Sequence, residues 1–281
     1  MTGAQQASMR KGLWYVAWLV VCLGFLAFFI GPFFWMFFTS FKARPDIVRF
    51  PPRLLPTEWI TDNYVAMWTE LNWLPMFWNS AWITSVSVVL VIFFNSLAGF
   101  SFAKMRWPLR NFFFLFIIAG LIVPEQVDLI PRFLMMVSWG LTGTYIPVIL
   151  FMIAQGFQTF MLRQFISTIP DDYIDAAKID GMGYFSIFMR IVLPLAKAGV
   201  LTMTIFTTFA VWNQYVYPLI YLTEQRQFTV QLGLGLLQQR LAGQFGPIMA
   251  GATVVSIPTM IIYLFFQRFF TAGITMVGIK G

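Results

Sequence analysis

The chain has 281 residues, of which 59% are hydrophobic and 10% charged, and its mean hydropathy is +0.76. Because a soluble globular domain carries roughly 25% charged residues, this composition excludes an ordinary soluble fold and predicts an all-α integral membrane protein. Histidine is absent and Cys22 is the single cysteine, which excludes histidine acid–base chemistry, a Cys/His metal site and an internal disulfide. The basic residues behind the net charge of +7 are scattered, which argues against nucleic-acid binding.

The apolar residues come in long runs without charge, and a bilayer core needs about 20 such residues in a helix. Five clear runs occupy residues 12–41, 71–103, 133–162, 198–223 and 241–267. A shorter run at 111–124 spans only if part of 125–131 completes it. We therefore expect six transmembrane helices. The first run is too long for a signal peptide and has no small-residue cleavage site, so we expect it to remain as a helix.

The basic residues between the runs indicate an orientation with both termini in the cytoplasm. Cytoplasmic segments then carry eleven of the 18 basic residues and four acids, whereas external segments carry the other seven basic residues and seven acids. The eleven are Arg10, Lys11, Lys104, Arg106, Arg110, Arg163, Lys178, Arg190, Lys197, Arg268 and Lys280. This orientation makes 163–197 a long cytoplasmic loop and places 42–70 and 224–240 outside.

The cytoplasmic loop contains a pattern typical of a short helix. Asp171 or Asp172 can cap its start and Gly181 can close it in a left-handed conformation, which predicts about two turns. So short a helix needs packing to be stable. The small side chains of Ala176 and Ala177 allow another protein to approach closely. A second amphipathic stretch, containing Tyr184, Phe185, Phe188 and Ile191, then leads to Pro194, where we expect the fifth span to begin.

Two motifs in this loop, Asp175-Ala176-Ala177-Lys178-Ile179-Asp180-Gly181 and Ile191-Val192-Leu193-Pro194, resemble the E-A-A…G…I-x-L-P signature of bacterial ABC importer permeases. Asp175 stands where that family usually has Glu, which keeps the charge on a shorter side chain. The resemblance implies a coupling helix that docks in a groove of a cytoplasmic ATPase. The residues it assigns to this role are Asp175, Ala176, Ala177, Asp180, Gly181, Ile191, Leu193 and Pro194.

Further motifs, in order along the chain, are similar to the carbohydrate-uptake branch and to the smaller permease subunit of the maltose transporter. They are Pro32, Trp35-Met36, Ser40-Phe41-Lys42, Asn63-Tyr64, Pro124-Glu125-Gln126, Ile130-Pro131, Trp212-Asn213-Gln214, Pro218-Leu219, Met249-Ala250-Gly251 and Gly278-Ile279-Lys280-Gly281. The resemblance implies the type I ABC importer permease fold. We expect an N-terminal helix with an external segment at 1–75, a transmembrane domain at 76–270 with its coupling loop at 164–197, and a cytoplasmic tail at 271–281.

The resemblance also implies partners: a second, homologous permease subunit, an ATPase dimer and an external solute-binding protein, all acting at the inner membrane. The chain has no phosphate-binding Gly-x-x-x-x-Gly-Lys-Ser/Thr loop, so we expect it not to be an enzyme and to hold no cofactor, with ATP and Mg on the partner. Lys280 and Gly281 are expected to contact the ATPase pair. The external segment 223–243 is a candidate contact for the binding protein, and a plain connecting loop is the alternative.

Polar side chains within the apolar runs are the candidates for a substrate path, because unpaired polar groups are costly in lipid. They are Gln155, Gln158, Thr204, Thr208, Trp212 and Asn213. The threonines have a structural alternative, since threonine often bonds its own helix backbone. We expect Glu125 and Asp128 to mark the outer end of the third helix. In the maltose system the other permease makes most sugar contacts, so this chain could line the path without binding sugar.

Three other functions compete with a sugar importer. A secondary transporter driven by an ion gradient is expected to show paired intramembrane charges or inverted repeats, and we find neither pattern in the sequence. An integral membrane enzyme such as a lipid-modifying transferase is disfavoured by the missing histidines and the few acids. An importer for amino acids, phosphonate or metal fits the loop motif but not the carbohydrate-type motifs around it.

Overall fold

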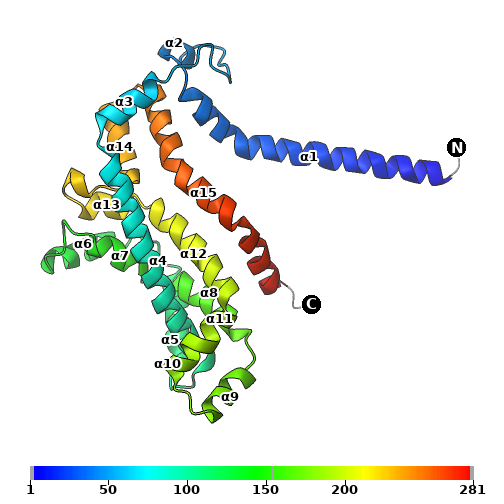
Figure 1. Cartoon of the computed structure of the whole chain (residues 1–281), viewed down its shortest axis with the longest axis vertical. Helices are drawn as coiled ribbons and strands as arrows, with labels where there is room; N and C mark the ends of the chain where they lie inside the picture. Colours follow the sequence, from blue (N-terminus) through cyan, green and yellow to red (C-terminus); the bar gives the residue numbers. More distant parts are fainter. Residues whose placement is uncertain (1–2, 154, 279–281) are drawn as a thin grey trace. The chain divides into compact units, whose positions relative to one another are not determined.

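The computed structural model describes residues 3–153 and 155–278, and every regular element within these two ranges is a helix (Figure 1). This confirms the all-helical class. The elements are α1 (Gly3–Thr39), α2 (Arg44–Ile47), α3 (Asp62–Glu70), α4 (Trp73–Lys104), α5 (Arg110–Gly120), α6 (Leu129–Ser138), α7 (Ile146–Ile153), α8 (Gly156–Ser167), α9 (Asp172–Ile179), α10 (Tyr184–Ile187), the π-helix η1 (Phe188–Val192), α11 (Leu193–Leu195), α12 (Lys197–Trp212), α13 (Val216–Tyr221), the 3-10 helix η2 (Gln225–Gln227), α14 (Val230–Arg240) and α15 (Phe245–Gly278).

The chain divides into two compact units, which we describe separately. The first contains residues 1–71 and 234–255, and the second contains residues 72–233 and 256–281. In the first unit, α1 includes an apolar stretch, Trp14–Thr39, and an 18-residue window within it has a mean hydropathy of 2.4 and no buried residue. A helix that is apolar and uncovered in this way needs lipid or another subunit around it.

Two sequence motifs of the first unit hold each other in place. The side-chain amide of Asn63, on α3, donates to the carbonyl oxygens of Ser40 and Lys42, both at 2.9 Å. The Ser40 hydroxyl and the Tyr64 hydroxyl lie 2.7 Å apart, and the ring of Tyr64 lies 5.0 Å from that of Phe41. These contacts join the end of α1 to α3 and thereby fix the connecting segment.

Lys42 completes this junction although lysine is seldom buried. Its side chain is 2% exposed, its Nζ donates to the carbonyl oxygen of Arg53 at 2.5 Å, and it lies 4.5 Å from the centre of the Trp35 ring. Burial lowers the pKa of Lys42, while the nearby Asp46 carboxylate acts in the opposite direction. The motif around residues 40–42 is therefore a packed corner.

Replacing Asn63 with alanine should destabilise the first unit by about 1–3 kcal/mol, because it leaves two carbonyl oxygens without their donor at a buried position. Thermal unfolding of the detergent-solubilised chain measures this loss. Thr69→Ala is the matched control on the same helix, since Thr69 is exposed and bonds only carbonyl oxygens of its own helix. Equal melting of the two variants would contradict the proposed junction.

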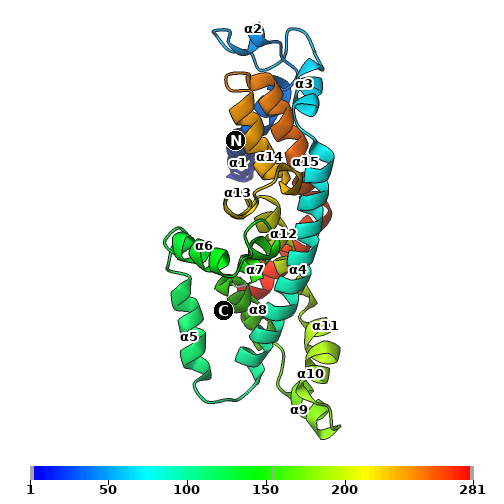
Figure 2. The same ribbon diagram turned by 90° about the vertical axis from the view of Figure 1, so that its left-hand side faces the viewer.

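The second unit is built around α4, against which α8 packs closely. A Cβ added at Gly99 of α4 would lie 2.9 Å from the backbone nitrogen of Arg163 on α8, so the two helix backbones touch at this glycine. On its other side α8 contacts α5, where a Cβ at Gly156 would lie 3.0 Å from the carbonyl oxygen of Ile117. Figure 2 shows α8 between α4 and α5.

The predicted spans hold for three of the six runs. Those at 12–41, 71–103 and 241–267 largely coincide with parts of α1, α4 and α15, which contain the three stretches long and apolar enough to cross a membrane. The run at 133–162 is not one helix but three, α6, α7 and α8; left-handed Gly140 and Gly143 lie between the first two. The run at 198–223 is divided into α12 and α13, and that at 111–124 yields only the 11 residues of α5.

The break in the fifth run has a local cause. Asn213 ends α12, and its side-chain amide donates to the carbonyl oxygen of Phe209 at 2.9 Å. Polar side chains that bond to the preceding turn offer the backbone an alternative to continuing the helix. Of the segments expected outside, 224–240 contains the whole of α14 and 42–70 contains α2 and α3, so neither is a plain loop.

Candidate functional site

The loop between α8 and α12 contains the helix that its sequence predicts. Helix α9 has eight residues, about two turns, which confirms the expected length. Gly181 has a φ of +78° and is the left-handed residue after the helix, as expected. Its N–H donates to the carbonyl oxygen of Lys178 at 3.0 Å, and the N–H of Met182 donates to that of Ala177 at 2.9 Å. This pair of bonds is the Schellman motif, which closes the C-terminal end of a helix.

The expected side-chain cap at the start of α9 is wrong for Asp171. Asp171 is the residue before the helix, but its carboxylate makes no capping bond. It instead accepts a hydrogen bond from the Lys104 ammonium at 2.6 Å. Asp172 and Asp175 lie in the first turn and Lys178 in the last, which suits the helix dipole at both ends.

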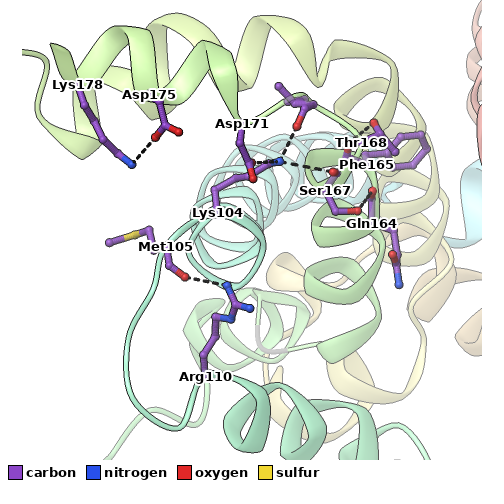
Figure 3. A network of polar contacts seen from close by, with 11 residues as sticks. Lys104, Met105, Arg110, Gln164, Phe165, Ser167, Thr168, Asp171, Asp175 and Lys178 are labelled. Carbon is purple, nitrogen blue, oxygen red and sulfur yellow. Dashed lines mark hydrogen bonds and ion pairs between the residues drawn. The ribbon is translucent and has the colours of Figure 1, made fainter. Parts of the chain in front are cut away.

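Lys104, the last residue of α4, contacts the end of α8, the connection after it and the residue before α9 (Figure 3). Its Nζ donates to the carbonyl oxygen of Ile169 at 2.5 Å and lies 3.5 Å from that of Ser167, in addition to its bond with Asp171. Ser167 ends α8, where carbonyls lack partners within the helix, and Ile169 follows two residues later in the connection to α9. The Lys104 side chain is 6% exposed. One buried ammonium thus links α4, α8 and the start of α9.

The same contact controls the titration of Asp171. Its pKa is lowered from the ordinary 3.8, first by the hydrogen bond from Lys104 and then by that residue's charge. Because the pKa is lower in the folded protein, the ion pair stabilises the fold above the ordinary value and is lost as the pH falls through the lowered one. At neutral pH the pair is therefore fully formed.

Apolar packing holds α9 against the rest of the second unit. Ile174 and Ala177 are 2% and 3% exposed and belong to a buried cluster with Phe100 of α4 and with Ile187 and Phe188. Ala177 therefore packs closely inside this chain, although it also lines the hollow along α9, and its expected contact with a partner stays a prediction. Figure 1 shows α9 and α10 at the C-terminal end of α4.

The opposite face of α9 is open and partly apolar. Tyr173 is 54% and Ile179 86% exposed, and Ala176 lies between them on the exposed side. A shallow hollow of about 540 Å³ runs along the helix, with Pro170, Ala176 and Asp180 in its lining. An exposed apolar face on a helix that is anchored from behind is typical of a docking surface.

The second motif of the loop forms a bent support behind α9. Ile191 and Leu193 are partly buried against the cluster of Phe100, whereas Pro194 is exposed. The π-helix η1 leads into α11, and the helical stretch Tyr184–Leu195 makes an angle of 81° with α12. Helix α12 therefore starts at Lys197, three residues after Pro194, where the fifth span was expected to begin, because the chain turns sharply between them.

The structure separates the predicted substrate-path residues. Thr204 and Thr208 donate to carbonyl oxygens of their own helix at 2.8 and 2.7 Å, in line with the structural alternative for threonines. Trp212 is 6% exposed beside Phe77, and the Asn213 oxygen accepts from Gln231 at 2.9 Å. The second unit contains a cavity of about 720 Å³ between α4, α5 and the junction of α7 with α8, and these four residues do not line it.

Gln155 alone among these candidates lines that cavity, and the buried Gln158 donates to its side-chain oxygen at 3.1 Å. Arg132 and Tyr217 were not predicted from the sequence, and they form one polar network with Glu125 at the cavity. The clue available in the sequence was three charged residues, Glu125, Asp128 and Arg132, between two apolar runs. Lys280 and Gly281 lie outside the described residues.

Comparison with solved structures places this arrangement of helices in a known class. The fold is similar to that of a chain in the crystal structure of a bacterial ABC transporter involved in the import of the acidic polysaccharide alginate, with a TM-score of 0.80 over 93% of this chain and 98% of that chain at 21% identity. The two chains therefore share a fold over nearly their whole length.

The sequence places the chain more narrowly. It belongs to the family described as binding-protein-dependent transport system inner membrane component, which it matches over residues 95–276. It is 34% identical to the arabinooligosaccharides transport system permease protein AraQ of Halalkalibacterium halodurans, covering 97% of this chain and 99% of that protein. It is 30% identical to the lactose transport system permease protein LacG of Rhizobium radiobacter, covering 87% and 89%. The chain is thus a multi-pass inner-membrane transport protein.

Proposed function

We propose that the chain is a permease subunit of an ATP-driven, binding-protein-dependent importer of a sugar. The observation that carries the proposal is the anchored α9, which presents Tyr173, Ala176 and Ile179 outward while Lys104 and the Phe100 cluster hold it from behind. The similarity to permeases named for arabinooligosaccharides and lactose supports a sugar as the solute.

The proposed topology has six spans and both termini in the cytoplasm. Under it, α9 and Lys104 lie on the cytoplasmic side, in agreement with the distribution of basic residues. The bent pair α7–α8 counts as one broken span, α12 with α13 counts as another, and α5 is a short span completed by the residues after Gly120. Broken helices are tolerated at membrane depth where they line a cavity or are buried in protein.

The chain works with a second permease subunit, a dimeric ATPase and an external solute-binding protein. ATP and Mg bind on the ATPase, whose hydrolysis supplies the energy. The exposed apolar stretch of α1 is covered by lipid or by the second permease. The exposed face of α9 enters a groove of the ATPase.

In this mechanism α9 transmits movement as a rigid joint. When the ATPase dimer closes, it displaces α9, and the bonds of Lys104 carry this displacement to the ends of α4 and α8. The close glycine contact between α4 and α8 makes the two helices move as one body. Alternating access then follows from rigid-body movement of these helices against the second permease.

Reconstitution tests the proposal. Vesicles holding the chain with its second permease and ATPase should accumulate arabinotriose or lactose only when ATP is inside and the loaded binding protein outside. Uptake is measured with radiolabelled sugar, and vesicles lacking the ATPase are the control. Uptake by the chain alone without ATP would instead establish a secondary transporter.

A further inference from the structure

A cavity lies within the second unit, between α4, α5, the segment that leads to α6, and the junction of α7 with α8. Its volume is about 720 Å³, which falls in the range of small-molecule sites. Four phenyl rings line it, those of Phe94, Phe116, Phe151 and Phe157. Flat apolar surfaces of this kind pack against the C–H faces of a sugar ring.

Charged groups meet at one side of the cavity. Arg132 forms an ion pair with Asp128 and donates to the Tyr217 hydroxyl at 3.1 Å, and that hydroxyl donates to the Glu125 carboxylate at 3.3 Å. The Arg132 guanidinium lies 4.9 Å from the centre of the Phe151 ring. Glu125 itself is exposed on the cavity side of this network.

Amide groups extend the network from Glu125 toward α4 and α8. The side-chain amide of Gln155 donates to Glu125 at 3.4 Å, and the Asn95 amide donates to the carbonyl oxygen of Ile153 at 3.1 Å. Thr159 donates to the Asn95 oxygen at 2.6 Å. The buried Gln158 side-chain oxygen has no hydrogen-bond donor in the part of the chain that is described.

Helix packing accounts for only part of this network. Asn95 and Thr159 are buried and join α4 to α8, which is a structural role. Glu125 and Gln155 face open space, and their mutual bond is long. A carboxylate and an amide that both retain donor or acceptor capacity, beside aromatic walls, can bind hydroxyl groups.

Resting on the proposed function, we propose that this cavity is where the chain contacts the transported solute and that it selects an uncharged saccharide. Glu125 accepts hydrogen bonds from sugar hydroxyls, Gln155 both donates and accepts, and the phenyl rings pack against the sugar's apolar faces.

The charges of the lining explain the selectivity. The lining holds two carboxylates, Glu125 and Asp128, and one guanidinium, Arg132, which is already paired with Asp128. Glu125 therefore has no cation of its own within the described lining. An anionic solute beside Glu125 would be repelled by this charge at short range.

Cysteine labelling in the complete importer tests the site. Cys22 is the single cysteine, so Cys22→Ala gives a cysteine-free background. Gly120→Cys places a reporter thiol in the lining without removing a proposed contact, and a Cβ there meets no atom within 4 Å. A methanethiosulfonate reagent is added with the binding protein docked, either empty or loaded with arabinotriose or lactose, at a fixed nonhydrolysable ATP concentration.

We expect the loaded binding protein to slow labelling of this reporter thiol by about tenfold relative to the empty one, because the sugar occupies the cavity. Adding Glu125→Gln should abolish this protection while the reporter thiol still labels at the unprotected rate, which shows that the variant is folded. Glu58→Cys, exposed in the external segment 42–70, is the control and should label equally with both forms of the binding protein.

The outcomes separate this proposal from the function it rests on. Uptake of arabinotriose or lactose without protection of the reporter thiol overturns the site and leaves the permease function standing. Uptake of an alginate oligosaccharide in place of the neutral sugars overturns the charge selectivity. Failure to take up any of these saccharides overturns the sugar-importer function and the site together.

Discussion

Replacing Gly181 with valine is expected to abolish ATP-driven uptake by the assembled importer while leaving the chain in the membrane in normal amount. The reason is the backbone, since a Cβ at Gly181 meets no atom within 4 Å. The φ of +78° costs a residue with a side chain about 1–2 kcal/mol, and more when it is β-branched. Valine would therefore open the two bonds that close α9 and release Met182 from the buried cluster.

Gly183 offers a matched control two residues away. It also has open space around its Cβ position, but its φ is −71°, which any residue adopts. Gly183→Val should keep uptake within about twofold, in the range of ordinary surface substitutions. Gly181→Asn should fall between the two, because asparagine tolerates the left-handed conformation. Normal uptake by Gly181→Val would remove α9 from the coupling path, and equal loss in both valine variants would show that bulk, not backbone conformation, is decisive.

Features that depend only on residues close together in the chain could be predicted from the sequence. The two turns of α9 and the left-handed Gly181 follow from local capping rules, and the three long helices follow from uninterrupted apolar runs. Division of the other runs was not predictable in the same way. Residues 133–162 contain glycine but few polar residues, so their hydropathy predicts a single span where the structure has α6, α7 and α8.

Several contacts at the site join residues far apart in the chain, and these contacts could not be predicted from the sequence. Lys104 counted only as a basic residue near the end of a span, whereas its partners lie 63 to 67 positions further along the chain. Glu125 was expected to mark the end of a helix, and its bond to Tyr217 joins residues 92 positions apart. The burial of Ala177 was not predicted. It depends on contacts with Phe100 and Phe188, which the pattern of residues within the loop does not reveal.

Lys104→Met should uncouple ATP hydrolysis from transport. The methionine fills a similar volume but cannot donate to Ile169 or Asp171, so the substitution removes charge-assisted bonds at a side chain that is 6% exposed. The loss amounts to about 2 kcal/mol at the joint, a smaller figure than for a fully buried pair because Asp171 is 71% exposed. The ratio of sugar imported to ATP hydrolysed should fall by up to about thirtyfold, since about 1.4 kcal/mol corresponds to a factor of ten.

Lys178→Met is the control, because Lys178 pairs with Asp175 on the open surface of α9, and exposed pairs contribute about 0.2–1 kcal/mol. It should leave the ratio within about twofold. Asp171→Asn separates the two kinds of bond at Lys104: it removes the ion pair but keeps the bonds to the end of α8, so an intermediate ratio is expected. A Lys104→Met importer with a normal ratio would mean that movement passes from α9 to α4 through the apolar cluster alone. A proportional fall in uptake and ATP hydrolysis would mean that Lys104 serves only stability.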